Sequence, residues 1–315
     1  MIRKDTVFAV QFDQFGSPDV LHLGEFPEPH AGPGQVRIRV RAAGVAPIDL
    51  AMRAALAPSA KTLPLPHVPG VDAAGTVDEL GSGVTGVAVG DEVFGAVDIS
   101  KLGGAAAEFA VLAFWAAKPD SMPSAEAGAA GTSIETATRV LDLLKVGDGQ
   151  TVLIDGAAGG VGSVVTQLAI ARGATVIGTA SEGNQDFLAG LGATPVVYGA
   201  GLPDRVRALG TGKITGAIDI SGHGSLADLI ELTAHADRVL TIADFAGAAL
   251  GVHVSRGELG GEPGGRHGLA EAARLFQAGR FVVPIQEAFP FAEAAAAHEL
   301  AEHGSRRGKI VLTAP

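Results

Sequence analysis

The glycine-rich run at residues 156–162, GAAGGVG, is the part of the sequence whose residue types and spacing most clearly indicate chemistry. It follows an apolar run at residues 151–155. A segment with apolar residues at helical spacing comes next, and then a second apolar run that begins at Thr175. In a strand–turn–helix–strand unit, small residues let the backbone approach a pyrophosphate, and the helix N-terminus offers unpaired N–H groups and a positive dipole end. The pattern therefore predicts a dinucleotide site. Ala157 stands at the first glycine of the G-x-G-x-x-G fingerprint, so a tight turn that binds nothing is the alternative.

The tip of the second strand, residues 179–181, bears on which dinucleotide binds. A site specific for NAD places Asp or Glu there to hold the ribose 2′-hydroxyl, whereas this chain has Thr-Ala-Ser. A small hydroxyl side chain leaves room for the 2′-phosphate of NADPH. Against this, the sequence has no lysine or arginine between Arg172 and Arg205, and a phosphate normally recruits a cation. The sequence favours NADPH but leaves NADH open.

Bulk composition limits the class of protein. The 315 residues suggest two domains, and although 47% of them are hydrophobic, no run approaches the roughly 18 uninterrupted apolar residues of a membrane span. The first residues do not resemble a signal peptide, so we expect a cytoplasmic protein. The net charge of −11 argues against nucleic acid and anionic membranes as partners. Cysteine is absent and no two of the nine histidines have ligand spacing, so we expect no metal site.

The two parts of the chain have different periodicity. Up to about Ser124 the apolar residues alternate as in strands, most strictly at residues 35–41, and we expect no helix of useful length there. From residue 125 onward strand and helix patterns alternate, which predicts a parallel sheet with helices on both faces. Residues 257–268 are rich in glycine and are expected to form a mobile loop or a connection between domains. The last apolar run, at residues 309–312, is expected to be a strand that rejoins the first domain.

Six short motifs, in this order, resemble the medium-chain dehydrogenase/reductase superfamily, and within it the zinc-independent quinone oxidoreductase-like reductases. They are PGVDAAG at 69–75, VGDEVFG at 89–95, GAAAEF at 104–109, AAGGVG at 157–162, LGA at 191–193 and GKIVL at 308–312. The resemblance implies an α/β fold with two domains: a GroES-like β-rich catalytic domain at residues 1–121 and 257–315, and a Rossmann domain with a doubly wound parallel sheet at residues 122–256. It also implies hydride transfer from NADPH to a quinone or an α,β-unsaturated carbonyl, whose own carbonyl takes up the developing charge.

Zinc-dependent members of the superfamily carry cysteine near Val45 and Ala46 and Gly-His-Glu where this chain has residues 70–72, Gly-Val-Asp. Their zinc chemistry is therefore not expected here. Many relatives also have Asn at the position of Ala46 and several have Tyr at that of Ala51. Asp49 is the one weak catalytic candidate, with pairing to Arg53 as its alternative. Lys101 and His67 lie in loops that could border the substrate cavity.

The resemblance further implies the cofactor contacts. Residues 181–184 resemble the S-x-x-K/N signature for the 2′-phosphate, and Tyr198 follows the third strand, where relatives carry an aromatic residue. The full set is Ala46, Pro47, Thr136, Ala158, Gly159, Gly160, Val161, Ser181, Asn184, Tyr198, Ser221, Ile242, Ala243 and Phe245.

Two other functions stay open. One is an enoyl reductase of carrier-bound acyl thioesters, for which a basic patch would be expected. The other is a dinucleotide-binding protein without catalysis, which the changes at Ala46 and Ala51 keep possible. Zinc-free relatives are commonly dimers, so we expect a homodimer, with residues 250–254 as a candidate edge strand.

Overall fold

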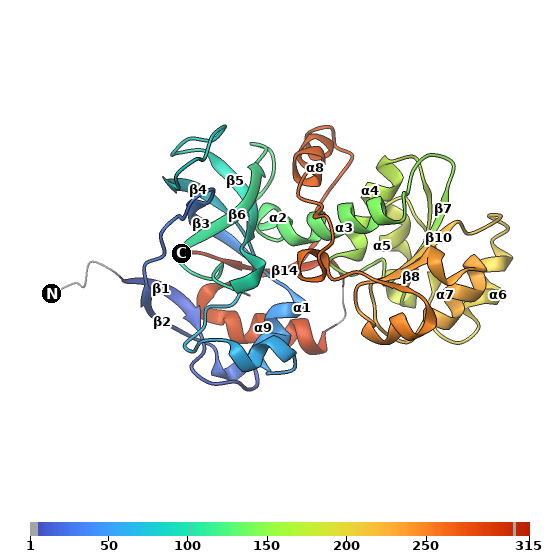
Figure 1. Ribbon diagram of the computed structural model, residues 1–315, viewed down its shortest axis with the longest axis horizontal. Helices are drawn as coiled ribbons and strands as arrows, with labels where there is room; N and C mark the ends of the chain where they lie inside the picture. Colours follow the sequence, from blue (N-terminus) through green and yellow to red (C-terminus); the bar gives the residue numbers. More distant parts are fainter. Residues whose placement is uncertain (1–5, 102, 305–306) are drawn as a thin grey trace. The chain divides into compact units, whose positions relative to one another are not determined.

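The computed structural model describes residues 6–101, 103–304 and 307–315. Contacts divide the described chain into two compact units (Figure 1). The first contains the described residues up to Thr132 together with Leu269–Gln277 and Val283–Pro315, and the second contains Ser133–Gly268 and Ala278–Val282. Compact units and domains need not end at the same residue, so the boundaries at 121/122 and 256/257 stay a prediction.

The first unit is built mainly on antiparallel strands. They are β1 (Thr6–Gln11), β2 (His22–Pro27), β3 (Val36–Val45), β4 (Asp72–Leu80), β5 (Glu92–Val97), β6 (Phe109–Ala117), β13 (Ile285–Pro290) and β14 (Lys309–Thr313). β3 pairs with β4 and β6, and β5 pairs with the same two strands, so these four close on themselves. The strict alternation in β3 buries Val36, Ile38 and Val40 and leaves Arg39 and Arg41 exposed. This confirms the expected β-rich domain.

The C-terminal strand β14 pairs antiparallel with β3, with Ile310 opposite Val45, and parallel with β13. The prediction that the end of the chain rejoins the first domain is therefore confirmed. Because Lys309 precedes Ile310, this pairing also brings Lys309 to the end of β3, near Asp72 and Asp49.

Helices of the first unit are mostly short. They are α1 (Pro47–Arg53), α2 (Ser124–Gly128), α8 (Gly268–Gln277, of which the first unit contains Leu269–Gln277) and α9 (Ala294–His303). The expectation of no useful helix before Ser124 was wrong at α1. Its seven residues span two turns, and it buries Asp49 and Arg53 beside Met52, so no apolar period marks it in the sequence.

The second unit contains a six-stranded parallel sheet. Its strands are β7 (Thr151–Asp155), β8 (Thr175–Ala180), β9 (Thr194–Val197), β10 (Gly216–Asp219), β11 (Val239–Thr241) and β12 (His253–Val254). Their order across the sheet is β12-β11-β10-β7-β8-β9, and every neighbouring pair is parallel. The predicted doubly wound parallel sheet is confirmed.

The helices of this unit connect the strands. They are α3 (Gly131–Leu143, which begins in the first unit), α4 (Gly162–Ala171), α5 (Gln185–Gly190), α6 (Leu202–Ala208) and α7 (Leu226–Thr233). The chain runs outward from β7 through β8 to β9, crosses back to β10, and then runs outward the other way. Because parallel crossovers are right-handed, this reversal places α4 and α5 on one face and α6 and α7 on the other. Ligands of such sheets bind at the carboxyl ends of the strands where the order reverses, here between β7 and β10.

Residues 257–268 are not a free loop. They begin with a 3-10 turn, Gly257–Gly260, and contacts group them with the second unit. The N–H of Gly265 donates to Glu135 Oε1 at 2.9 Å, and the N–H of Gly257 donates to Glu262 Oε2 at 2.8 Å. Carboxylates of α3 and of the segment itself thus satisfy backbone donors, which glycine composition alone does not reveal. The residues that follow, Leu269–Gln277, are grouped with the first unit, which fits the alternative expectation of a connection between domains.

Candidate active site

The glycine turn lies between β7 and α4, beside the point where the strand order reverses. Gly156 has a φ of 81°, in the left-handed region, and a Cβ there would lie 3.1 Å from the Cβ of Ser221. A Cβ on Gly162 would lie 2.1 Å from the carbonyl oxygen of Gly156, so only glycine lets the helix begin this close to the strand. Val161, at the N-cap of α4, supplies no side-chain cap. The turn thus has the form that suits a pyrophosphate at a helix N-terminus.

The four predicted contacts on this turn differ in exposure. Ala158 is buried, whereas Gly159, Gly160 and Val161 are partly exposed. A Cβ on Gly159 would meet only the carbonyl oxygen of Gly156, at 3.5 Å, so the backbone is open on that side.

Two buried carboxylates flank the same point. Asp155 ends β7, Asp219 ends β10, and their Cα atoms are partners in the parallel register. Asp155 Oδ1 accepts a hydrogen bond from the Thr179 hydroxyl at 2.5 Å. Its Oδ2 accepts from the hydroxyls of Ser221 at 2.5 Å and Ser225 at 2.9 Å. One carboxylate therefore joins the ends of β7 and β8 to the turn after β10.

Asp219 makes the matching contacts on the other side. Its Oδ2 accepts from the Thr241 hydroxyl at 2.7 Å, and its Oδ1 accepts from the N–H groups of Ser221 and Gly222 at 3.0 and 2.9 Å. The Thr241 hydroxyl in turn accepts from the N–H of Asp244 at 2.9 Å. The turns after four neighbouring strands are thus tied into one polar network at the carboxyl edge of the sheet.

Sequence reasoning named Ser221 from this network and missed Asp155, Thr179, Asp219 and Thr241. An aspartate at the end of each of two buried apolar runs is the signal that could have found the carboxylates. Their pairing could not be read from the sequence because it depends on the strand order.

The ends of β8 and β9 meet at this edge, since Ala180 and Val197 are register partners. Ser181, the residue after Ala180, is partly exposed, and Asn184 is buried. Tyr198, the residue after Val197, is 57% exposed. The structure therefore brings Ser181 and Tyr198 to neighbouring strand ends, while the side chain of Asn184 lies largely inside.

Three predicted contacts, Ile242, Ala243 and Phe245, form the turn after β11. The N–H of Ile242 donates to the carbonyl of Asp219 at 3.1 Å, and a Cβ on Gly222 would lie 2.9 Å from the Cβ of Ala243. The turns after β10 and β11 are thus in close contact. Phe245 is 64% exposed, with the Arg256 guanidinium 5.7 Å from its ring centroid.

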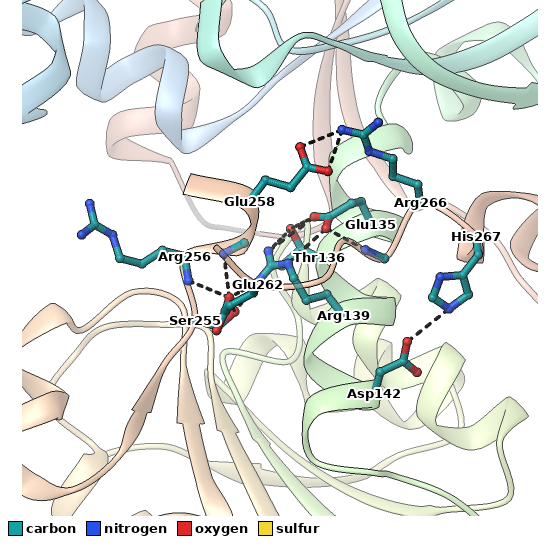
Figure 2. Close-up of polar contacts among 12 residues, drawn as sticks. Glu135, Thr136, Arg139, Asp142, Ser255, Arg256, Glu258, Glu262, Arg266 and His267 are labelled. Carbon is teal, nitrogen blue, oxygen red and sulfur yellow. Dashed lines mark hydrogen bonds and ion pairs between the residues drawn. The ribbon is translucent and has the colours of Figure 1, made fainter. Parts of the chain in front are cut away.

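Thr136, on α3, belongs to a polar cluster built around Arg139 (Figure 2). The Arg139 guanidinium donates to Glu135 Oε1 at 3.0 Å, to the Thr136 hydroxyl at 3.3 Å and to the Ser255 hydroxyl. Thr136 is partly exposed, so its hydroxyl is held in place without being buried.

Glu262 completes this cluster from the glycine-rich segment (Figure 2). Its Oε2 accepts from the Ser255 hydroxyl at 2.7 Å and from the N–H groups of Arg256 and Gly257 at 3.1 and 2.8 Å, and Oε1 lies 2.6 Å from His253 Nε2. Burial raises the pKa of Glu262, but hydrogen bonds from Ser255, His253 and Gly257 outweigh it and hold the pKa below its usual value. The segment is therefore anchored by a carboxylate that stays ionised.

In the first unit, Ala46 and Pro47 link β3 to α1, and Asp49 fixes that link. Asp49 Oδ2 accepts from the N–H of Ala46 at 2.7 Å, and Oδ1 accepts from the N–H of Gly70 at 3.0 Å. The side chain is 1% exposed. Both oxygens accept hydrogen bonds from backbone N–H groups, which favours a role in positioning the link between β3 and α1 over a role in catalysis. The alternative pairing with Arg53 was wrong, since Arg53 donates to the carbonyl of Gly16 at 2.7 Å and pairs with Glu302.

Three buried charges lie together here. Burial raises the pKa of Asp49 to about 7 against the two backbone hydrogen bonds, and nearby Asp72 raises it further while Lys309 lowers it. Lys309 Nζ lies 3.9 Å from Asp72 Oδ2, and burial lowers the lysine pKa in spite of both carboxylates. Asp72 accepts from the N–H and hydroxyl of Thr132 at 2.6 and 2.7 Å.

The residues at the positions of the zinc ligands do not fit zinc. Val45, Ala46 and Val71 are apolar and buried, Asp72 is hydrogen-bonded to Thr132, and the chain has no cysteine. Glu299, Glu302 and His303 do come together, on α9, where Glu302 already pairs with Arg53.

The other two residues considered for the substrate cavity differ in exposure. His67 is buried, with its ring 5.5 Å from that of Phe12, and Lys101 is exposed. In the described part of the chain, no helix has the length and apolar character that a membrane crossing requires.

Comparisons with known proteins cover most of the chain. Residues 32–119 match the alcohol dehydrogenase GroES-like domain, and residues 191–312 match the zinc-binding dehydrogenase family. The chain is 31% identical to quinone oxidoreductase of Mus musculus over 336 aligned positions, covering 96% of this chain and 97% of the mouse protein. It is 35% identical to the NADPH-dependent alkenal/one oxidoreductase of Arabidopsis thaliana, but over 58% of this chain and 50% of that protein.

Among solved structures, the quinone oxidoreductase from Coxiella burnetii is similar over the whole length. Its TM-score is 0.83 at 31% identity, with 98% of this chain and 99% of that chain covered.

Proposed function

The chain belongs to the quinone oxidoreductase-like branch of the medium-chain dehydrogenase/reductase superfamily, and on this basis we propose that it is a zinc-independent, NADPH-dependent oxidoreductase that transfers hydride to a quinone or an α,β-unsaturated carbonyl. The names of the mouse, plant and Coxiella relatives support both acceptor classes. The observation that carries the proposal is the glycine turn with an uncapped helix at the reversal point of a six-stranded parallel sheet.

The residues of the second unit would hold a nicotinamide dinucleotide. The turn of Ala158, Gly159, Gly160 and Val161 would take the pyrophosphate at the N-terminus of α4. Ser221 and the turn after β11, with Ile242, Ala243 and Phe245, would border the nicotinamide half. Thr136 would offer its hydroxyl to the ribose or a phosphate.

NADPH rather than NADH is proposed from the end of β8. An acidic residue there would repel the 2′-phosphate, whereas this strand ends in Thr179 and Ala180 and is followed by Ser181. The Thr179 hydroxyl already serves Asp155 and the N–H of Gly156, which leaves Ser181 as the free hydroxyl at this end. Asn184 and Tyr198 would complete the site, although Asn184 is buried and would contribute through a limited exposed edge.

A dihydronicotinamide bound by these residues would supply the hydride. The acceptor carbonyl takes up the developing negative charge, so no Lewis acid is needed. The resemblance also assigns cofactor contacts to Ala46 and Pro47, in a loop whose backbone is held by Asp49. Because both Asp49 oxygens accept from backbone N–H groups, we assign the final proton to water rather than to Asp49.

The test is NADPH oxidation at 340 nm with a panel of quinones and aliphatic enones, with NADH in parallel and a pantetheine thioester as a third acceptor class. Turnover of at least one quinone or enone above the background without enzyme is expected, faster with NADPH than with NADH. Turnover of the thioester alone would replace the proposal with a carrier-dependent enoyl reductase. Cofactor binding without turnover of any acceptor would favour a non-catalytic binding protein.

We also propose a homodimer that acts in the cytoplasm. β12 is the edge strand of the second sheet and could pair with its copy in a second chain. Light scattering at two concentrations would test this, and a monomer at both would contradict it.

A further inference from the structure

The proposed NADPH site lacks an obvious cation. Between Arg172 and Arg205 the sequence contains no lysine or arginine, and Glu182 and Asp186 near the end of β8 are exposed acids. A 2′-phosphate in this place would need a positive charge supplied from elsewhere in the fold.

Arg205, in the first turns of α6, folds back over the end of β9. Its Nε donates to the carbonyl of Val197 at 3.0 Å, Nη1 to Ala200 at 2.7 Å, and Nη2 to Tyr198 and Gly199 at 3.2 and 2.9 Å. Four carbonyls of one turn therefore hold the guanidinium in a fixed place.

These contacts orient the guanidinium without cancelling its charge. Carbonyl oxygens are neutral, and among the described residues no carboxylate lies within ion-pair distance of Arg205. Arg207, on the same helix, pairs instead with Asp204 at 3.4 Å and with Glu231. Described residues accept from four of the five guanidinium N–H groups, which leaves one on Nη1 without a partner among them, and the side chain is partly exposed.

The position of this charge follows from the register. Val197 and Ala180 are partners on adjacent parallel strands, which are about 4.8 Å apart. The guanidinium is bonded to Val197 and to the turn just beyond it, and Ser181 lies just beyond Ala180. A cation from a later helix thus stands at the strand end next to the one where the 2′-phosphate is expected.

We propose that Arg205 binds the 2′-phosphate of NADPH and is the residue that determines preference for NADPH over NADH, with Ser181 donating from the neighbouring strand end. The inference rests on the proposed function, since it assumes that a nicotinamide dinucleotide binds at this edge. It explains why the end of β8 needs no cation of its own.

The experiment compares two probes that differ only in the 2′-phosphate, adenosine 2′,5′-bisphosphate and adenosine 5′-monophosphate, by calorimetry on the full chain. The wild type is expected to bind the bisphosphate more tightly. Arg205→Gln is expected to weaken bisphosphate binding by about tenfold or more while changing monophosphate binding less than about twofold. Arg207→Gln, on the same helix but already ion-paired, is the matched control and should change neither.

Loss of affinity for both probes to the same extent in Arg205→Gln would overturn the proposal and show that Arg205 only supports the turn. Unchanged bisphosphate binding would overturn it as well. Should Arg205→Gln fail to fold, Arg205→Lys keeps the charge without the four-carbonyl geometry. Arg205→Lys should retain part of the preference for the bisphosphate over the monophosphate. If this variant binds the monophosphate as the wild type does but no longer prefers the bisphosphate, the charge at position 205 does not determine the preference. A wild type that does not distinguish the probes would refute the NADPH preference itself, before any variant is considered.

Discussion

Ala157 in the glycine turn fills space that Gly178 on β8 leaves empty. A Cβ added at Gly178 would lie 2.7 Å from the Cβ of Ala157, closer than such atoms approach. The departure from the dinucleotide fingerprint at Ala157 is therefore matched by a glycine on the neighbouring strand. The side chain of Ala157 is accommodated because position 178 carries no Cβ.

This relationship predicts that Gly178→Ala destabilises the protein, by about 1–3 kcal/mol as for other overpacked cores, in urea unfolding followed by circular dichroism. Adding Ala157→Gly should restore part of the loss, because the second change removes the clashing Cβ. Gly183→Ala, where a Cβ meets nothing within 4 Å, is the control and should cost little. Equal loss in the single and double variants would show that the two sites are not coupled.

Asp155 should act on cofactor binding through the hydroxyls that it holds. Asp155→Asn keeps only one acceptor oxygen for the three hydroxyls of Thr179, Ser221 and Ser225. We expect the KM for NADPH to rise by about tenfold, with a smaller change in kcat, because lost hydrogen bonds loosen the turns without touching the acceptor. Steady-state kinetics with varied NADPH is the measurement. Asp204→Asn, at an exposed site, should leave the KM unchanged; the idea fails if Asp155→Asn also leaves it unchanged.

Glu262 should be the residue that keeps the segment 255–268 in place. Glu262→Gln removes the negative charge that faces Arg139 and His253 and keeps a single acceptor oxygen for the donors of Ser255, Arg256 and Gly257. A loss of about 1–3 kcal/mol of local stability is expected, seen as faster hydrogen exchange of this segment. Glu258→Gln, which breaks only the exposed pair with Arg266, should not change the exchange. Equal exchange in the two variants would contradict the anchoring function.

The buried carboxyl of Asp49 predicts a pH dependence of stability. Burial raises its pKa from 3.8 to about 7 in the folded chain, so between these values the folded state binds a proton that the unfolded state has released. Its contribution to stability is therefore complete below pH 4 and is lost as the pH rises to about 7. The free energy of unfolding of wild type minus that of Asp49→Asn should fall over this range and then level. A difference that is constant from pH 4 to pH 8 would show that the carboxyl titrates alike in both states.

His298 predicts the opposite slope at lower pH. Burial, with a contribution from Arg53, lowers its pKa to about 3, whereas the unfolded histidine titrates near 6.5. The stability that the neutral ring contributes is present above pH 6.5 and is lost as the pH falls toward 3. His298→Gln should weaken this acid sensitivity in unfolding curves measured from pH 7 to pH 4. An unchanged slope would assign the acid sensitivity to other groups.

The sequence by itself determined the elements that depend on local pattern. The alternation of β3 and the order of strand, glycine turn and helix from Thr151 to Ala171 were readable because neighbouring residues along the chain create those periods. The same local signals indicated the parallel sheet and the absence of zinc ligands. Helix α1 was not predicted from the sequence, because a helix of two turns that buries an aspartate and an arginine has no apolar period.

Tertiary structure decided which distant residues share a site. Asp155 and Asp219 lie 64 positions apart and become neighbours only through the strand order. Arg205 reaches the end of β9 because α6 turns back over it, which no count of basic residues along the sequence could show. Likewise the N–H of Gly265 donates to the carboxylate of Glu135, 130 positions away in the sequence, and this hydrogen bond holds the glycine-rich segment to α3. Such contacts depend on how the elements pack, and packing is a property of the whole chain rather than of any window of it.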